Sequence, residues 1–185
     1  GTNSLLDAVV FGERAGKSVL EYVRGKDFGN VNEGHEKAKV LEKFEDVFQR
    51  DGSESYNDIR DDMKEIMMSH CGVFRDDKKL KVCIDTLKEL QVRFKKGKVT
   101  DKGKIFNTEI YEIMELGNML RMAEVIAAAA LYRQESRGGH SRTDFPKRDD
   151  KKFLHHSMVY DSPDGFVIKT KPVVITKYPV TERTY

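Results

Sequence analysis

The stretch LYRQESRGGHSRTDFP, residues 131–146, connects the end of a long apolar segment to a dense cluster of charged side chains. Arg137 and Arg142 carry planar guanidinium groups that suit carboxylates or rows of carbonyl oxygens. Gly138 and Gly139 allow the chain to leave a helix sharply, and the proline that closes the stretch prevents helical continuation. We therefore expect this segment to end the helical part of the chain, and we expect its arginines to fix the position of the chain that follows.

The bulk composition indicates a folded protein with a well-solvated surface. The chain has 185 residues, of which 38% are hydrophobic and 35% are charged. This length corresponds to one domain or slightly more, and it can bury a core without disulfides. The 33 basic and 31 acidic residues nearly cancel. Because nucleic-acid binding needs a clear basic excess on one face, nucleic acid is not an expected partner.

The remaining bulk features bear on compartment and on the extent of the chain. The two cysteines, Cys71 and Cys83, lack the spacing of a Cys-x-x-Cys motif, which favours a reducing compartment. No apolar run reaches the ~20 residues that a membrane span needs, and no signal peptide is visible. The chain starts without a methionine and inside a motif. We expect it to be a fragment of a longer polypeptide.

The hydrophobic pattern predicts a mainly α fold, an antiparallel helical bundle with short connections. Apolar residues recur at three- and four-residue steps, and serine, asparagine, aspartate and glycine stand at the predicted helix ends. Gly97, for example, is the predicted cap of the fourth helix. The predicted helices cover residues 4–24, 36–49, 55–71, 77–96 and 107–134.

The last of these helices is predicted to be the central one, because it is apolar on two sides. Phe106, Ile110 and Leu120 belong to one side, and Met122 and Ile126 to the other. A helix of this kind should lie between neighbours rather than on the surface. The run of four alanines at 127–130 would allow another backbone to approach closely.

After residue 146 the pattern changes to short runs rich in β-branched and aromatic residues. These runs cover residues 157–160, 166–168 and 173–176, and a turn signal at 161–165 separates the first two. We expect a small β-hairpin or meander in an otherwise extended C-terminal tail.

Recognisable catalytic and metal-binding motifs are missing. The chain has no Gly-x-Gly-x-x-Gly and no P-loop, so it carries no dinucleotide-binding fingerprint. His70 lies on an apolar helical face, where a core or edge histidine is expected. His155 and His156 would point to opposite sides of an extended strand, which is poor geometry for a shared metal. We therefore assign no catalytic and no metal-binding residue.

Two groups of residues remain as candidate sites. The first is the start of the first helix at Asn3, Ser4 and Leu5, where unpaired backbone N–H groups can act as an ordinary cap or face an electron-rich group. The second combines Arg137, His140 and Arg142. These side chains suit an anionic substrate, or ion pairs between domains or subunits with the nearby glutamate and aspartate of the segment.

Three blocks of sequence resemble the C-terminal region of the flavoprotein subunit of succinate dehydrogenase and fumarate reductase. The blocks are GTNSLLDAVVFG at the start, DKGKIFNT with ELGNML leading into the 131–146 segment, and RDD, FLHH, KPV and the terminal ERTY. The region 25–100 matches only in pattern. Departures are small, such as Gly139 where alanine is usual and Ser141 where a larger residue is common.

The resemblance implies a function that the residues alone do not reveal. The complete subunit would interconvert succinate and fumarate with FAD and pass electrons to or from an iron–sulfur subunit. Asn3, Ser4 and Leu5 match the turn that approaches the flavin ring. The substrate-binding arginine of the family lies just before Gly1, so the fragment should be inactive and should hold no FAD by itself. Residues 1–25 would be the last helix of the flavin-binding domain, residues 26–146 a helical bundle domain, and residues 147–185 a β-containing tail.

The same resemblance suggests partners and a location, and two rival functions remain open. The partners would be the flavin-binding and capping domains of the same subunit, the iron–sulfur subunit and a dicarboxylate. The protein would be cytoplasmic and would reach the membrane only through partner subunits. The physiological direction and the quinone are not specified. The rivals are the C-terminal domain of an L-aspartate oxidase and a stand-alone helical interaction module.

Overall fold

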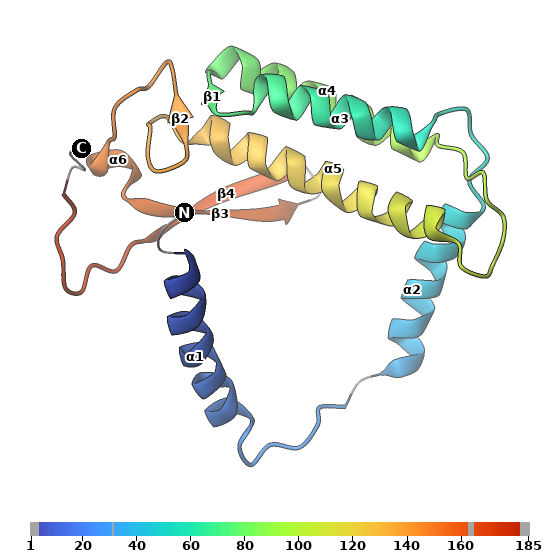
Figure 1. The fold of residues 1–185 in the computed structure, drawn as a ribbon, viewed down its shortest axis with the longest axis horizontal. Coiled ribbons are helices and arrows are strands. Elements are labelled where there is room, and N and C mark those ends of the chain that lie inside the picture. The colour runs from blue at the N-terminus through green and yellow to red at the C-terminus, as the bar shows by residue number, and fades with distance from the viewer. Residues whose placement is uncertain (1–3, 31, 163–164, 182–185) are drawn as a thin grey trace. The chain divides into compact units, whose positions relative to one another are not determined.

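The computed structural model describes residues 4–30, 32–162 and 165–181. Contacts divide the chain into two compact units, residues 1–41 and 42–185. The mainly helical class and the small β-hairpin are confirmed, as the ribbon in Figure 1 shows. The predicted boundaries at residues 25 and 146 remain expectations.

The first unit holds α1 (Ser4–Val23) and the beginning of α2 (Glu33–Phe48). No residue of α1 is buried. Its apolar residues are largely exposed, as with Leu5 at 81% and Val9 at 69%. An amphipathic helix with an uncovered apolar face is typical of an element that packs against a further partner.

The second unit is built on three long helices whose starts lie within one residue of the predicted ones. The side chains of Ser55, Asp76 and Asn107 each accept a hydrogen bond from the backbone N–H three residues further on. Because these polar side chains satisfy otherwise unpaired amides, the helix starts coincide with the sequence signals. The helices are α3 (Tyr56–His70), α4 (Asp77–Lys95) and α5 (Thr108–Tyr132).

The longest helix, α5, lies between α3 and α4 on one side and the β-hairpin on the other (Figure 1). Ala127 is fully buried at this contact, as the alanine run predicts. The second apolar side is covered only in part. The helix thus lies between neighbours, as predicted, but Met122 and Ile126 on this side remain 56% and 45% exposed. Phe106 is 97% exposed, because it precedes the Asn107 cap with a φ of 52°.

The helices share one hydrophobic core that also takes up the end of α2. The side chains of this core are 7% exposed or less. They include Val47, Phe48, Ile59, Met63, Leu80, Cys83, Leu87, Leu90, Val99, Ile110, Ile113, Leu116, Leu120, Ala123 and Ala130.

Gly97 has a packing role in addition to its place after α4. The cap residue of α4 is Lys96, one residue before the predicted position. A Cβ at Gly97 would lie 2.1 Å from a ring carbon of Tyr56. The tyrosine ring is buried and rests edge-on against Phe94. A glycine is therefore needed here because an aromatic ring occupies the space of a side chain.

The C-terminal tail contains α6 (Asp150–Phe153) and an antiparallel hairpin of β3 (His155–Ser162) and β4 (Gly165–Pro172). The third run, at residues 173–176, forms no strand, so of the two predicted alternatives the tail holds the hairpin and not the meander. β4 ends at Pro172, which has no backbone N–H to continue the ladder. None of the helices within the described ranges is sufficiently long and apolar for a membrane crossing.

Candidate functional site

Arg142 follows α5 by ten residues, and its fully buried side chain lies against the C-terminal end of that helix. Its Nη1 donates to the carbonyl oxygens of Ala130, Leu131 and Arg133, at 3.0, 3.2 and 3.4 Å. Its Nε and Nη2 donate to the two carboxylate oxygens of Asp144, at 2.8 and 2.7 Å. The last carbonyls of a helix have no intrahelical partner and carry partial negative charge. Arg142 therefore caps α5 from inside the protein, and Asp144 neutralises it.

Glu135 is the second fully buried charge of the segment. Its Oε1 accepts hydrogen bonds from Arg133 Nη1 at 2.5 Å and Arg137 Nε at 2.8 Å. Its Oε2 accepts from Arg137 Nη2 at 3.0 Å and from the backbone N–H of Asp149 at 2.7 Å. Burial by itself would raise the pKa of this carboxyl, but the hydrogen bonds outweigh burial and the pKa is lowered. Glu135 is thus an ionised centre that ties the exit of α5 to the start of α6.

The turn between Arg137 and His140 closes this cluster. The two residues exchange backbone hydrogen bonds of 2.8 and 3.0 Å around Gly138 and Gly139. Gly138 has a φ of 57°, in the left-handed region, whereas Gly139 does not. A Cβ at either position would meet no atom within 4 Å. The backbone conformation therefore requires glycine at 138 only, which explains how alanine is compatible with position 139.

His140 connects the turn to a distant part of the chain. β2 (Ser141–Arg142) pairs in parallel with β1 (Phe74–Arg75). Arg75 Nη1 lies 3.1 Å from His140 Nδ1, and His140 Nε2 lies 3.0 Å from the Arg133 carbonyl oxygen. Because arginine can only donate, Nδ1 accepts and Nε2 carries the proton. Burial of the ring and the neighbouring guanidinium charges lower the pKa of His140. His140 is therefore a neutral linker rather than a cation.

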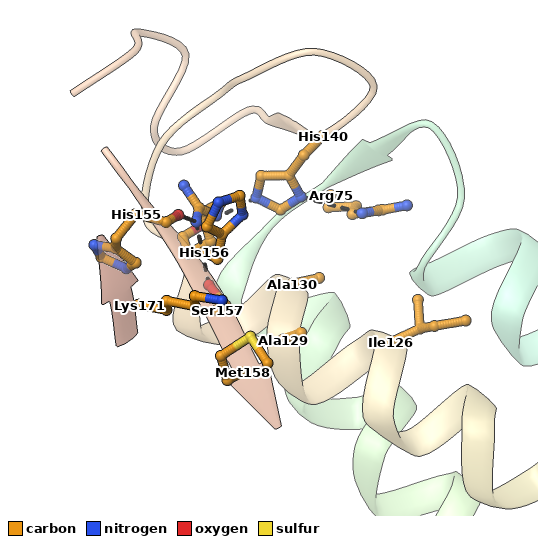
Figure 2. Close-up of a pocket in the computed structure, with 11 residues that line it drawn as sticks. Arg75, Ile126, Ala129, Ala130, His140, His155, His156, Ser157, Met158 and Lys171 are labelled. Atoms are coloured by element: carbon orange, nitrogen blue, oxygen red, sulfur yellow. Dashed lines mark hydrogen bonds between the residues drawn. The ribbon is translucent and has the colours of Figure 1, made fainter. Parts of the chain in front are cut away.

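A pocket of about 680 Å³ opens beside this cluster. Arg75 and His140 form one wall, the end of α5 forms another, and the first residues of β3 form a third (Figure 2). The volume lies within the range of ligand-binding pockets. The lining residues are Arg75, Ile126, Ala129, Ala130, Arg133, His140, His155, His156, Ser157, Met158 and Lys171.

The two candidate groups of the sequence belong to different units of the chain. Asn3 lies outside the described residues, while Ser4 begins α1 and Leu5 is 81% exposed on it. Arg137, His140 and Arg142 are brought together at the end of α5. Their acidic partners belong to this chain, and the pairings of Arg137 with Glu135 and of Arg142 with Asp144 are present.

Three residues of the pocket were not found from the sequence: Arg75, Arg133 and Lys171. Arg133 stands at the predicted helix end, where a basic residue is itself a signal. Arg75 and Lys171 are 65 and 31 residues away from His140 and carry no local signal. His70 is half-buried, and its Nδ1 lies 2.7 Å from Ser69 Oγ. No group of three or more histidine, cysteine or acidic side chains in the described ranges is placed to hold a metal.

Comparison with known proteins identifies this arrangement. Residues 60–185 match the family model described as fumarate reductase flavoprotein C-term. The fumarate reductase flavoprotein subunit of Escherichia coli K12 is 39% identical over all of this chain, which spans 31% of that relative. The succinate dehydrogenase flavoprotein subunit of Rickettsia bellii is 34% identical over 95% of the chain and 30% of the relative. A solved mutant of E. coli quinol fumarate reductase superposes with a TM-score of 0.89 at 36% identity, covering 98% of this chain and 32% of that chain.

The helical bundle with its arginine-capped central helix thus defines a domain of flavoprotein oxidoreductase subunits. The chain belongs to the fumarate reductase and succinate dehydrogenase flavoprotein family and corresponds to its C-terminal region. It spans about a third of the length of the curated relatives it matches.

The two glycines of the turn provide a matched pair of substitutions. Gly138→Ala should destabilise the chain by about 1–2 kcal/mol, since an L-residue is strained in the left-handed region. Gly139→Ala should be neutral or stabilising by up to ~1 kcal/mol, since it restricts only the unfolded chain. Urea unfolding of the two variants measures the difference. Equal destabilisation by both would contradict the assigned backbone conformations.

The pair of Arg142 and Asp144 should make stability depend on acid pH. The hydrogen bonds from Arg142 outweigh desolvation and lower the pKa of Asp144 from 3.8 to about 2. The ionised carboxylate therefore stabilises the fold above pH 4, and this contribution is lost as pH falls from about 4 to 2. Because Asp144 is partly exposed, the contribution is on the order of 1 kcal/mol after solvent screening. Asp144→Asn should make the unfolding free energy less dependent on pH between about pH 4 and pH 2.

The test compares unfolding free energies from pH 5 to pH 2. At pH 5 the Asp144→Asn variant should be the less stable protein, because it leaves the buried guanidinium without a counter-charge. The gap to the unmodified chain should narrow toward pH 2. Asp161→Asn is the control, since it removes an exposed carboxylate that pairs with Arg121. Parallel profiles of Asp144→Asn and the unmodified chain would contradict the role of this pair.

Proposed function

We propose that this chain is part of a subunit that interconverts succinate and fumarate and exchanges electrons between FAD and an iron–sulfur subunit. The observation that carries the proposal is the match along the whole chain to subunits named fumarate reductase and succinate dehydrogenase flavoproteins. A solved quinol-fumarate reductase with menaquinol molecules also superposes at a TM-score of 0.87.

FAD in the complete subunit would be contacted by the start of α1, at Asn3, Ser4 and Leu5. The described part of this element fits such a role, because α1 begins at Ser4 and exposes Leu5. The amide groups of a helix start favour electron-rich partners, and the exposed leucine offers an apolar contact. FAD would supply the redox chemistry when bound. This chain has no dinucleotide-binding motif, so other residues of the subunit must hold most of the cofactor.

Residues 1–25 are proposed to pack on the flavin-binding part of the subunit. The support is the uncovered apolar surface of α1, which includes Leu6 at 63% and Phe11 at 58% exposed. Such a surface is unfavourable in water and is typical of an interface. The protein would be cytoplasmic and peripheral, reaching a membrane through partner subunits.

Arg137, His140 and Arg142 are proposed to serve assembly rather than chemistry. In support, Arg142 is fully buried and His140 is a neutral linker. Arg137 is engaged by Glu135 and by Asp150, at 2.6 Å from the latter. Side chains occupied in this way hold the segment in shape and leave little capacity for a substrate. They would fix the shape of the segment on which the rest of the subunit docks.

The function is tested by expressing the complete subunit and the 185-residue chain side by side. The complete subunit should contain FAD and reduce an artificial dye with succinate, whereas the shorter chain should be colourless and inactive. Visible spectra and dye reduction measure both properties. Turnover of L-aspartate in place of succinate would favour an L-aspartate oxidase. Flavin bound by the shorter chain would contradict the assignment of the cofactor site.

Arg137→Ala in the complete subunit tests the assembly role. The substitution leaves Glu135 with fewer donors and should lower the yield of flavin-containing subunit or its binding of the iron–sulfur subunit. Activity per bound flavin should change little. Arg148→Ala is the matched control, because Arg148 is equally exposed and pairs with Asp150 but does not contact Glu135. A large loss of activity per flavin with normal assembly would place Arg137 in the catalytic machinery.

A further inference from the structure

The pocket beside the Arg142 cluster is basic and has no acidic lining residue. Three of its side chains are arginine or lysine and three are histidine. One of these charges, on Arg133, is balanced by Glu135 outside the lining. Arg75 and Lys171 pair with no carboxylate in the part of the chain that the structure describes. The pocket therefore holds uncompensated positive charge.

Two features of the hairpin lie beside this charge. His156 and Lys171 lie directly opposite each other in the hairpin register. Basic residues at such a position repel each other when both are charged. In addition, His155 Nε2 is buried without a hydrogen-bond partner, and no other buried side-chain nitrogen or oxygen is so placed among the described residues. The His155 ring packs against Tyr132 and Phe153, on the strand face opposite to His156 and Lys171, so the charge that the pocket offers comes from Arg75 and Lys171.

The surface around the pocket is apolar. Ile126 and Met158 line the pocket and are 45% and 38% exposed. Met122 stands one helical turn before Ile126 on the same side of α5 and is 56% exposed. Figure 2 shows Ala129 of α5 next to Met158 of the strand, with Ile126 farther along the helix. A small free anion would satisfy the charges but would leave this apolar surface in water. A protein segment that bears a carboxylate satisfies both.

We propose that this pocket receives an aspartate or glutamate side chain from the part of the same flavoprotein subunit that lies outside these 185 residues. The proposal rests on the proposed function, which makes the chain one third of a longer polypeptide. Its relatives carry about twice as many further residues, since the chain spans 31% of the E. coli subunit. Those residues are tethered to this chain, so their effective concentration favours them over a separate partner.

Carbodiimide cross-linking of the complete, flavin-containing subunit tests the pocket. The reagent condenses a carboxylate with an amine in contact with it, and Lys171 supplies the amine. Peptide mass spectrometry should find Lys171 joined to an aspartate or glutamate of the same polypeptide outside residues 1–185. Lys171→Arg keeps the charge and should abolish the cross-link while leaving flavin content unchanged. Lys171→Glu should lower the recovery of flavin-containing subunit several-fold.

Lys169 is the matched control, because it is an exposed lysine two residues earlier on β4 and does not line the pocket. Lys169→Glu should leave recovery unchanged. The proposal is overturned if Lys171 cross-links only within residues 1–185, to the iron–sulfur subunit, or not at all in a subunit that contains FAD and oxidises succinate. Those results leave the proposed function intact. A complete subunit without FAD and without turnover overturns both.

Discussion

The buried guanidinium of Arg142 is the interaction on which the C-terminal half of this protein depends. Removing a charge from water is costly unless its hydrogen-bonding capacity is filled. Here three carbonyl oxygens at the end of α5 and both oxygens of Asp144 surround it. The carbonyls need donors as much as the arginine needs acceptors, because a helix end leaves them unpaired. One side chain thus meets two requirements, and it fixes the residue at which α5 stops.

The position of the pocket follows from that helix end. The Arg133 carbonyl accepts from Arg142 and also from His140 Nε2. This second bond sets the tautomer of His140 and turns its Nδ1 toward Arg75. The short parallel pair of β1 and β2 then holds the α3–α4 connection against the exit of α5. The basic wall of the pocket is therefore a consequence of how the helix is capped.

The elements that the sequence predicted well are those governed by local interactions. Ser55, Asp76 and Asn107 begin helices because each side chain satisfies an amide three residues away. The glycine turn at 138 is equally local. The pairing of Arg75 with His140 joins residues far apart in sequence, and no spacing rule reveals it. Residues 173–176 have strand-like composition but no strand, because composition alone does not supply a hydrogen-bonding neighbour.

The exposed side of α5 shows a different limit of sequence reasoning. Its apolar pattern predicts a covered face, but Met122 and Ile126 find no cover within residues 42–185. A hydrophobic pattern predicts that a helix face is covered, but it does not indicate which chain segment covers it. The same holds for α1, whose apolar face is exposed.

The apolar face of α1 and the basic pocket require partners of different chemistry. The exposed face of α1 offers apolar side chains, and burial of such a face is favourable but tolerant of small shifts in position. The pocket adds the charges of Arg75 and Lys171, for which an acidic group is the matching partner. In the proposed docking, apolar burial would favour association without fixing the position of the partner, and the basic pocket would set the register. A partner displaced along α5 would leave Arg75 and Lys171 buried without a counter-charge, and this penalty selects one arrangement.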